Sequence, residues 1–278
     1  MIPPAALVKI ARAVLPALLA LAAALWVASR LPPPWGAVAV GAVAAAALGA
    51  ALLTLDTLVP GVNLFSRALH RLPAAAGADA VALTFDDGPV EPYTRQILDA
   101  LDRHGAKATF FCIGENIERS PELAREIVRR GHTLGNHTQT HRLLPRLPAG
   151  DIEAEIAGGV RAAERATGVH PRLLRCPKGY KGLRVMRVAR RLGLPLVGFS
   201  YPIYDVENPP AADLVGRVLG RVAPGDIILM HDGFPLDKPG SRSSLVEALP
   251  RILDGLRSRG LRPIALGGLP AGSLEQDV

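Results

Sequence analysis

The sequence predicts an α/β protein with a parallel sheet or barrel, preceded by an apolar region that anchors it in a membrane. Two observations lead to this prediction. From about residue 79 to residue 266, strand-like and helix-like stretches alternate strictly, and such alternation is typical of parallel β/α architectures. The first 60 residues instead contain two long uncharged segments, 13–29 and 31–55, each close to the length that crosses a bilayer.

The apolar region is predicted to form a transmembrane helical hairpin with spans at about 10–30 and 35–58. The run Pro32–Pro34 separates the two spans, and small residues four apart in the second span suit close helix packing in lipid. The hairpin is flanked by Lys9, Arg12, Arg67 and Arg71, whereas only Arg30 lies in its turn. The positive-inside rule then places the N-terminus and the C-terminal domain in the cytoplasm.

An alternative interpretation makes the first segment a cleaved signal peptide, with Lys9 and Arg12 as its basic region. The second segment would still anchor the protein, but the C-terminal domain would lie on the opposite side of the membrane. In the main interpretation, the chain divides into two spans in 1–60, a linker at 61–78, an α/β domain at 79–268 and a tail at 269–278.

Charge and cysteine content restrict the classes of partner. The net charge of +7 suits nucleic acid or an anionic membrane, but the sequence lacks the interleaved aromatic and basic residues that stack on bases, so nucleic acid is not expected. Cys112 and Cys176 are the two cysteines. They do not form a disulfide framework and are interpreted as small apolar residues near strands, a content compatible with a reducing compartment.

The elements of the α/β domain follow from local patterns. Proline at the start and glycine at the end of 121–131 mark a helix, and Asp151 is expected to cap the helix that follows. The segment 132–138 is short and rich in turn-forming residues. Strands are predicted at 81–85, 108–114, 172–177, 195–200, 226–232 and 262–266, and helices at 93–105, 121–131, 151–168, 183–193, 213–222 and 244–260.

The stretch TFDDGP, Thr84–Pro89, places two carboxylates at the end of the first predicted strand. Successive side chains of a strand point to opposite sides, and Gly88-Pro89 then turns the chain. A turn with two solvated aspartates is one interpretation. In parallel β/α folds, however, functional sites lie at the C-terminal ends of the strands. Four residues are expected there, namely Asp86, Asp87, Arg175 and His231.

The stretch NHTQTH contains His137 and His141, four residues apart. Two such histidines can share one face of a helical turn and bind one metal, although surface histidines with this spacing are common. With an aspartate they form a set of two imidazoles and one carboxylate, which leaves an open position for water, as in catalytic metal sites. Taken singly, His231 is compatible with a structural or exposed role, and Arg175 with a surface ion pair.

Together the ordered motifs TFDDG, HTQTH, RCPKG and LMHD resemble the polysaccharide deacetylases, the NodB-homology group of carbohydrate esterase family four. The resemblance covers roughly 79–266. It implies a distorted (β/α) barrel and metal-dependent removal of an acetyl group, usually from an N-acetylated sugar. One divalent ion is expected, most simply Zn²⁺, and the mixed N/O ligands would also accept Co²⁺, Ni²⁺ or Mn²⁺.

The resemblance also implies a role for each motif residue. Asp87, His137 and His141 match the metal ligands; Asp86 matches the catalytic base, Arg175 its supporting arginine, His231 the general acid and Asp205 the aspartate that orients this acid. Leu229 matches the apolar residue beside the acetyl methyl group, and Pro177, Lys178 and Tyr180 are expected to bind substrate. Lys178 stands where the family usually has an aromatic residue, and Phe199 and Val206 stand where it often has tryptophan, which puts the usual polymeric glycan in doubt.

The expected function is therefore a metal-dependent de-N-acetylase that acts on a glycan or on a membrane-linked glycolipid. The alternatives are an O-acetyl esterase on a polysaccharide and an inactive membrane-anchored protein that binds glycan or lipid. Lys178 offers a point charge suited to phosphate. Four further basic residues, Lys181, Arg184, Arg187 and Arg191, are expected to form one stripe of the following helix. Both features favour a lipid-phosphate substrate, although a solvated helix face explains the stripe equally well. The sequence does not predict the oligomeric state.

Overall fold

The computed structural model describes residues 21–32, 34–59, 62–65 and 68–269. The chain divides into two compact units, Met1–Leu55 and Asp56–Val278. Residues 21–28 are helical, and helix α2 (Trp35–Leu58) is long and apolar enough over Trp35–Thr57 to cross a membrane. Much of the first predicted span lies outside the described residues, so the two-helix hairpin stays a prediction.

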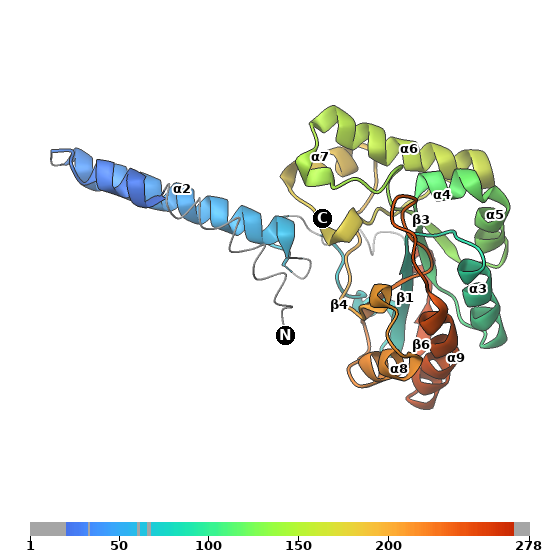
Figure 1. The fold of residues 1–278 in the computed structure, drawn as a ribbon. Coiled ribbons are helices and arrows are strands. Elements are labelled where there is room, and N and C mark those ends of the chain that lie inside the picture. The colour runs from blue at the N-terminus through green and yellow to red at the C-terminus, as the bar shows by residue number, and fades with distance from the viewer. Residues whose placement is uncertain (1–20, 33, 60–61, 66–67, 270–278) are drawn as a thin grey trace. The chain divides into compact units, whose positions relative to one another are not determined.

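The second unit is built around a parallel sheet that helices cover (Figure 1). The strands run in the order β3-β2-β1-β5-β4, and β6 pairs with β1. Every one of these strand pairs is parallel, which confirms the predicted α/β class. The strands are β1 (Ala80–Asp86), β2 (Thr109–Cys112), β3 (Thr133–Asn136), β4 (Tyr201–Pro202), β5 (Ile227–His231) and β6 (Arg262–Ile264).

Isolated bridges extend the sheet beyond β3. Leu174 bridges both Asn136 and Leu196, and the segment that contains Leu196 leads into β4 on the other edge of the sheet. These bridges favour the distorted barrel that the resemblance implies. The regular strands predicted at 172–177 and 195–200 do not form. Pro195 has no N–H to donate, and the carbonyl of Arg175 is engaged by the His137 side chain.

Helices occupy the connections between the strands, as alternation predicts. Helix α4 was not predicted, and Asp151 is not the N-cap of α6, because Pro148 holds that position and Asp151 lies in the first turn. An acidic residue in the first turn still favours the helix dipole. The helices are α3 (Tyr93–Arg103), α4 (Gly114–Arg119), α5 (Pro121–Arg129), α6 (Ala149–Thr167), α7 (Leu183–Arg191), α8 (Ala211–Leu219) and α9 (Ser243–Ser258). Short 3₁₀ helices lie at Ala74–Ala76, Leu144–Arg146, Pro177–Gly179, Asp205–Glu207 and Leu266–Gly268.

Strand β3 forms where the sequence predicted only a turn-rich segment. Leu134 is buried in the main core cluster. Gly135 lies so close to the neighbouring strand that a Cβ atom there would be 2.5 Å from the Phe111 ring. Pairing with β2 over the whole length of β3 therefore outweighs the weak strand propensity of glycine and asparagine.

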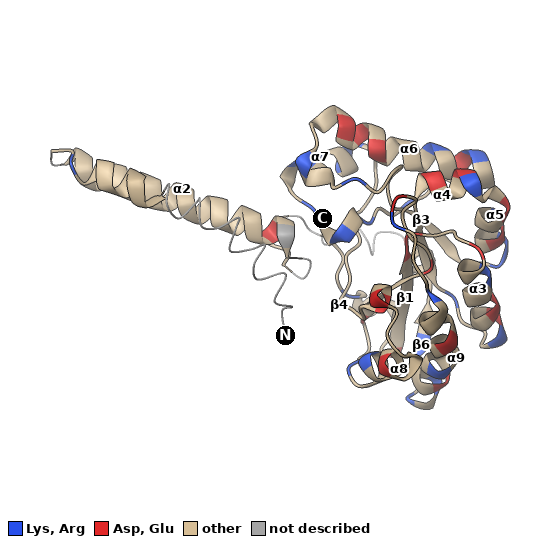
Figure 2. Cartoon of the chain, viewed as in Figure 1, with Lys and Arg blue, Asp and Glu red and all other residues tan. Residues whose placement is uncertain are grey.

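The central strands β1 and β2 are buried on both faces. All seven residues of β1 are buried, and Phe85 stacks on Phe110 of β2 with 5.0 Å between ring centroids. Figure 2 shows the consequence for charge, since the acidic and basic residues lie mainly on the helices and loops. Among β1, β2, β3 and β5, Asp86 is the one aspartate, glutamate, lysine or arginine. An ionised carboxylate within such a sheet is costly unless it is paired.

Part of the predicted linker at 61–78 pairs with the second unit. Leu69 bridges Val197, and Arg71 bridges Asp226. Ala68, Leu69 and Leu72 are buried. The second unit therefore begins at Asp56, well before the start of the predicted α/β domain.

Candidate active site

The C-terminal ends of the strands bring the predicted site residues together. Asp86, the last residue of β1, is in register with His231, the last residue of β5. His137 directly follows β3, and its backbone N–H bonds to the carbonyl of Cys112 at the end of β2. The site therefore lies at the edge of the sheet at which parallel β/α folds carry their functional residues.

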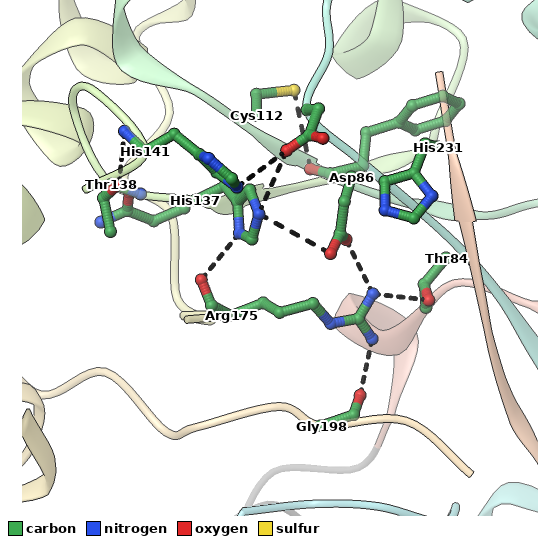
Figure 3. Close-up of polar contacts among 12 residues, drawn as sticks. Thr84, Asp86, Cys112, His137, Thr138, His141, Arg175, Gly198 and His231 are labelled. Atoms are coloured by element: carbon green, nitrogen blue, oxygen red, sulfur yellow. Dashed lines mark hydrogen bonds and ion pairs between the residues drawn. The ribbon is translucent and has the colours of Figure 1, made fainter. Parts of the chain in front are cut away.

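The two adjacent carboxylates both approach the His137 ring, and Figure 3 shows the Asp86 side chain directed at it. The Nε2 atom of His137 lies 3.7 Å from Asp86 Oδ2 and 3.4 Å from Asp87 Oδ1. The expectation that these side chains point to opposite sides is therefore wrong. Strand β1 ends at Asp86, and Asp87 adopts a left-handed conformation with φ 71°, which turns its side chain back toward the histidines.

Asp87, His137 and His141 form a cluster whose donor atoms all lie within 4.8 Å of one another. His141 Nε2 is 3.2 Å from Asp87 Oδ1, yet this buried oxygen has no hydrogen-bond partner among the described residues. Burial would raise the pKa of Asp87, but the neighbouring imidazoles lower it overall. A buried carboxylate oxygen between two imidazole nitrogens is a suitable donor set for a divalent cation.

Hydrogen bonds fix the orientation of both histidines. His137 Nδ1 lies 2.8 Å from the carbonyl oxygen of Arg175, so Nδ1 carries the proton and the lone pair of Nε2 is directed at the cluster. The spacing of His137 and His141 suggested that they share one helical turn, but they do not. Thr138 and His141 have φ values of 70° and 59°, and the Thr138 hydroxyl accepts the His141 backbone N–H at 3.1 Å. A folded loop thus brings the two rings together.

Arg175 is fully buried beneath Asp86, so the interpretation as a surface ion pair is wrong. Its Nη1 atom donates to Asp86 Oδ1 at 2.8 Å and to Thr84 Oγ1 at 2.7 Å. Its Nη2 atom donates to the carbonyl of Gly198 at 2.7 Å, and the guanidinium carbon lies 4.2 Å from the centre of the Phe111 ring. These contacts hold one oxygen of Asp86 and leave the other directed at the cluster.

Asp205 holds His231 through both carboxylate oxygens. His231 Nδ1 is 2.9 Å from Asp205 Oδ1, and the His231 backbone N–H donates to Oδ2 at 2.7 Å. Burial lowers the pKa of His231, but the charge and hydrogen bond of Asp205, with the two site aspartates, raise this pKa to about 9. The imidazole is therefore protonated at neutral pH, and its Nε2 atom remains available to a substrate.

The predicted substrate-binding residues lie on β5 and in the turn that follows Arg175. Leu229 lies two residues before His231 on β5, so both project from the same face of the strand. Pro177 and Lys178 form a tight turn in which Lys178 is exposed with φ 59°, and Tyr180, which follows, is half-buried. Burial and His137 lower the pKa of His141 to about 4, and the Lys178 ammonium group adds to this shift.

Two supporting residues were given no role from the sequence. Asn116 donates from Nδ2 to the carbonyls of Asp87 and Phe234 at 2.7 and 3.0 Å, so it fixes the backbone that carries the clustered carboxylate. Asp232 is buried and accepts the Thr94 hydroxyl at 2.6 Å, and burial raises its pKa to about 7. Asp232 belongs to the LMHD motif, which signals its position, whereas no motif marks Asn116.

Comparison with known proteins decides the family. A family model described as polysaccharide deacetylase matches residues 74–197. The chain is 36% identical over 191 residues to a peptidoglycan-N-acetylglucosamine deacetylase from Bacillus cereus, which covers 68% of this chain and 87% of the relative. The chain belongs to the polysaccharide deacetylase family. It is accordingly a hydrolase of the carbohydrate de-N-acetylase type.

Further relatives extend this polysaccharide deacetylase comparison. A chitooligosaccharide deacetylase from Sinorhizobium fredii is 37% identical over 193 residues, or 67% of this chain and 90% of the relative. A crystal structure of a peptidoglycan N-acetylglucosamine deacetylase in complex with 4-naphthalen-1-yl-N-oxidanyl-benzamide is 32% identical, has a TM-score of 0.67, and covers 72% of this chain and 91% of that one. A family pseudoenzyme from Bacillus anthracis is 26% identical, with a TM-score of 0.65, and covers 72% of this chain and 67% of that one.

Proposed function

We propose that the protein hydrolyses the N-acetyl group of an N-acetylated sugar with the help of one divalent cation held by Asp87, His137 and His141. The observation that carries the proposal is the position of this cluster beside the buried carboxylate of Asp86, close enough to the partly buried imidazole of His231 for the charge of Asp87 to act on it. When bound, a divalent cation polarises the amide carbonyl and acidifies water. Zn²⁺ is the simplest ion for this donor set.

Asp86 is suited to act as the general base. The hydrogen bond from Arg175 engages Oδ1 and leaves Oδ2 on the side of the cluster, where it can accept a proton from water. Adjacent carboxylates repel each other, and this repulsion favours protonation of one of them. The imidazoles of His137 and His141 oppose that effect for Asp87 by lowering its pKa, and the proposed cation would act in the same direction.

His231 is suited to act as the general acid. Asp205 accepts the Nδ1 proton, so the proton that moves to the amine leaving group is the one on Nε2. A pKa near 9 keeps this proton in place at neutral pH. Leu229 on the same strand face provides an apolar surface suited to the acetyl methyl group.

The metal assignment is tested by removing one ligand. His137→Ala is expected to abolish stoichiometric binding of Zn²⁺ and deacetylation while the circular dichroism spectrum is kept. His170→Ala is the matched control, because His170 is exposed and bonds to Glu164 away from the cluster. Metal content by mass spectrometry and acetate release from an N-acetylglucosamine oligomer provide the readouts. A purified protein that is metal-free, active and insensitive to chelators would refute the assignment.

The structural relatives include a pseudoenzyme. The presence of the proposed base with its arginine, and of the proposed acid with its aspartate, favours activity. Acetate release from N-acetylated and from O-acetylated oligosaccharides, measured side by side, separates the de-N-acetylase from the esterase and from an inactive binding protein.

A membrane-borne substrate with a phosphate group is a second candidate, and Lys178 is the residue that favours it. Its ammonium group is exposed and acts on His141, and a lysine provides a point charge suited to phosphate. We therefore include an N-acetylsugar linked to a lipid phosphate as a candidate substrate, beside the peptidoglycan and chitooligosaccharide glycans on which the named relatives act.

We propose that the chain is membrane-anchored through two spans in 1–60, and that a linker at 61–78, part of which packs into the second unit, leads to the catalytic domain and the tail. Helix α2 supports one span. The basic flanks favour a cytoplasmic catalytic domain, and a cleaved first segment would reverse this. A topology reporter fused after Val278 is expected to be active in the cytoplasm, and an external reporter would favour a cell-wall glycan.

A further inference from the structure

Residues 62–65, which follow the apolar helix α2, are bonded to the last turn of that helix. Asp56 lies in that turn and is buried. Its Oδ1 atom accepts hydrogen bonds from the backbone N–H groups of Leu64 and Phe65 at 2.6 and 3.1 Å. These two residues are therefore held beside the C-terminal end of the apolar helix.

A second set of hydrogen bonds involves Asn63. Asn63 donates from Nδ2 to the Ala68 carbonyl at 3.1 Å, and its Oδ1 atom accepts the Ala68 N–H at 2.7 Å. These bonds hold Asn63 beside Ala68, and the side chains of Leu64 and Phe65 are 50% and 39% exposed. Adjacent apolar side chains held outward by a fixed backbone are typical of an interaction surface.

Lys181 ties this segment to the start of α7. Its Nζ atom donates to the carbonyls of Asp56 and Val62 at 3.3 and 2.7 Å, and its backbone N–H donates to the carbonyl of Thr57 at 3.2 Å. Lys181 is only 3% exposed, so its predicted place in an exposed basic stripe is wrong. Helix α7 begins two residues later, next to the end of the apolar helix.

Helix α7 carries several basic residues (Figure 2). Arg191 pairs with Glu153 at 2.8 Å. Arg184, Arg187 and Arg190 are exposed, and the last two have no acidic partner in the part of the chain that the structure describes. Since a nine-residue helix is about 14 Å long, all three side chains start within about 14 Å of the first residue of α7, which follows Lys181 by two positions.

We propose that Leu64, Phe65, Arg184, Arg187 and Arg190 form a membrane-contact surface that rests the second unit on an anionic lipid bilayer. The inference relies on the membrane anchoring proposed above and not on the reaction. Leucine and phenylalanine enter the headgroup region favourably, and each basic residue near an anionic surface strengthens the contact about fivefold (about 1 kcal/mol). Because Lys181 follows Lys178 by three residues, the contact of this surface with the bilayer also holds the turn that carries Lys178 near the lipid.

The test uses the full chain in lipid nanodiscs and a bimane fluorophore on one introduced cysteine. Cys112 and Cys176 are buried, so the unmodified protein gives the labelling background. Phe65→Cys carries the reporter. Val169→Cys is the matched control, because Val169 is 37% exposed and lies far from α7. Glu153 of α6 pairs with Arg191 of α7, and Val169 follows Glu153 by 16 residues, about 24 Å away along and past α6. Nanodiscs contain phosphatidylcholine alone or with an equal amount of phosphatidylglycerol, plus a lipid spin-labelled near its headgroup.

The proposal predicts that the spin label quenches bimane at position 65 at least fivefold more than at position 169. It also predicts that quenching at position 65 falls severalfold in phosphatidylcholine alone and in the double variant Arg187→Glu, Arg190→Glu. Equal quenching at the two positions would overturn the proposal, as would quenching at position 65 that responds to neither lipid charge nor charge reversal. Acetate release from a soluble N-acetylglucosamine oligomer, measured on the same samples, reports separately on the proposed reaction.

Discussion

Replacement of Asp86 by asparagine separates the roles of the two adjacent carboxylates. Asp86→Asn keeps the shape of the side chain and one acceptor for Arg175 but removes the charge and the proposed base. We expect the metal to stay bound, because Asp87 and the two histidines are unchanged, and the rate to fall about a hundredfold or more. Asp87→Asn is expected instead to weaken metal binding itself.

The same replacement has a stability cost that follows from the burial of Arg175. Its guanidinium group is fully buried, and breaking a buried ion pair costs about 3 to 5 kcal/mol. Because Thr84 and Gly198 still accept hydrogen bonds from Arg175, we expect the lower value of about 3 kcal/mol. For a domain of this size that corresponds to a decrease of about 6 to 12 °C in Tm.

The assay combines metal content, acetate-release kinetics and thermal unfolding on the two variants. Asp86→Asn should be metal-loaded, slow and less stable, and Asp87→Asn should be metal-poor. Asp86→Asn is assayed well below its lowered Tm, so that the loss of rate does not come from unfolding. Equal loss of metal from both variants, or an unchanged Tm for Asp86→Asn, would refute the division of roles.

Three further predictions address the proposed acid His231, the exposed Lys178 and the turn at Gly88. With His231 at a pKa of about 9, activity should fall as pH rises through that value. In Asp205→Asn the fall should move to lower pH, because burial then lowers the pKa of His231 with less opposition. A pH profile of kcat/KM in which the fall does not move would exclude His231 as the acid. Lys178→Phe should reduce turnover of a phosphate-linked N-acetylsugar much more than that of a neutral one, and equal reductions in parallel assays would favour an ordinary polysaccharide substrate. Gly88→Ala should lower the free energy of unfolding by about 1 to 3 kcal/mol, because its Cβ atom would lie 2.0 Å from the buried Asp232 Oδ2. Gly150→Ala is the control, because a Cβ atom there meets nothing within 4 Å. Denaturant unfolding of both variants checks this, and equal stability would count against the packing argument.

The sequence predicted the helices and the main strands well, since their periodicity and boundary residues are local properties. It missed β3, because the strand character of Thr133–Asn136 comes from pairing with β2 and from the close approach of Gly135 to Phe111. It also predicted regular strands at 172–177 and 195–200, where side-chain hydrogen bonds and proline restrict pairing to single bridges.

Motifs marked the predicted site residues, although not Asn116, and the sequence did not reveal their geometry. The left-handed conformations of Asp87 and His141 bring both carboxylates and both imidazoles to one centre, and a sequence does not reveal such φ values for residues other than glycine. The burial of Arg175 and Lys181 was missed for a related reason. Each cation is buried by partners distant in the chain, namely Asp86 for Arg175 and the carbonyls of Asp56 and Val62 for Lys181.

The most direct test of the account is a metal titration of chelator-treated protein, with acetate release from an N-acetylglucosamine oligomer measured at each addition of Zn²⁺. If Asp87, His137 and His141 hold the catalytic ion, activity should rise in proportion to bound metal and saturate at one ion per chain. His137→Ala, titrated in parallel, should remain inactive throughout. Full activity before any metal is added, or the same titration curve for the variant, would contradict the account.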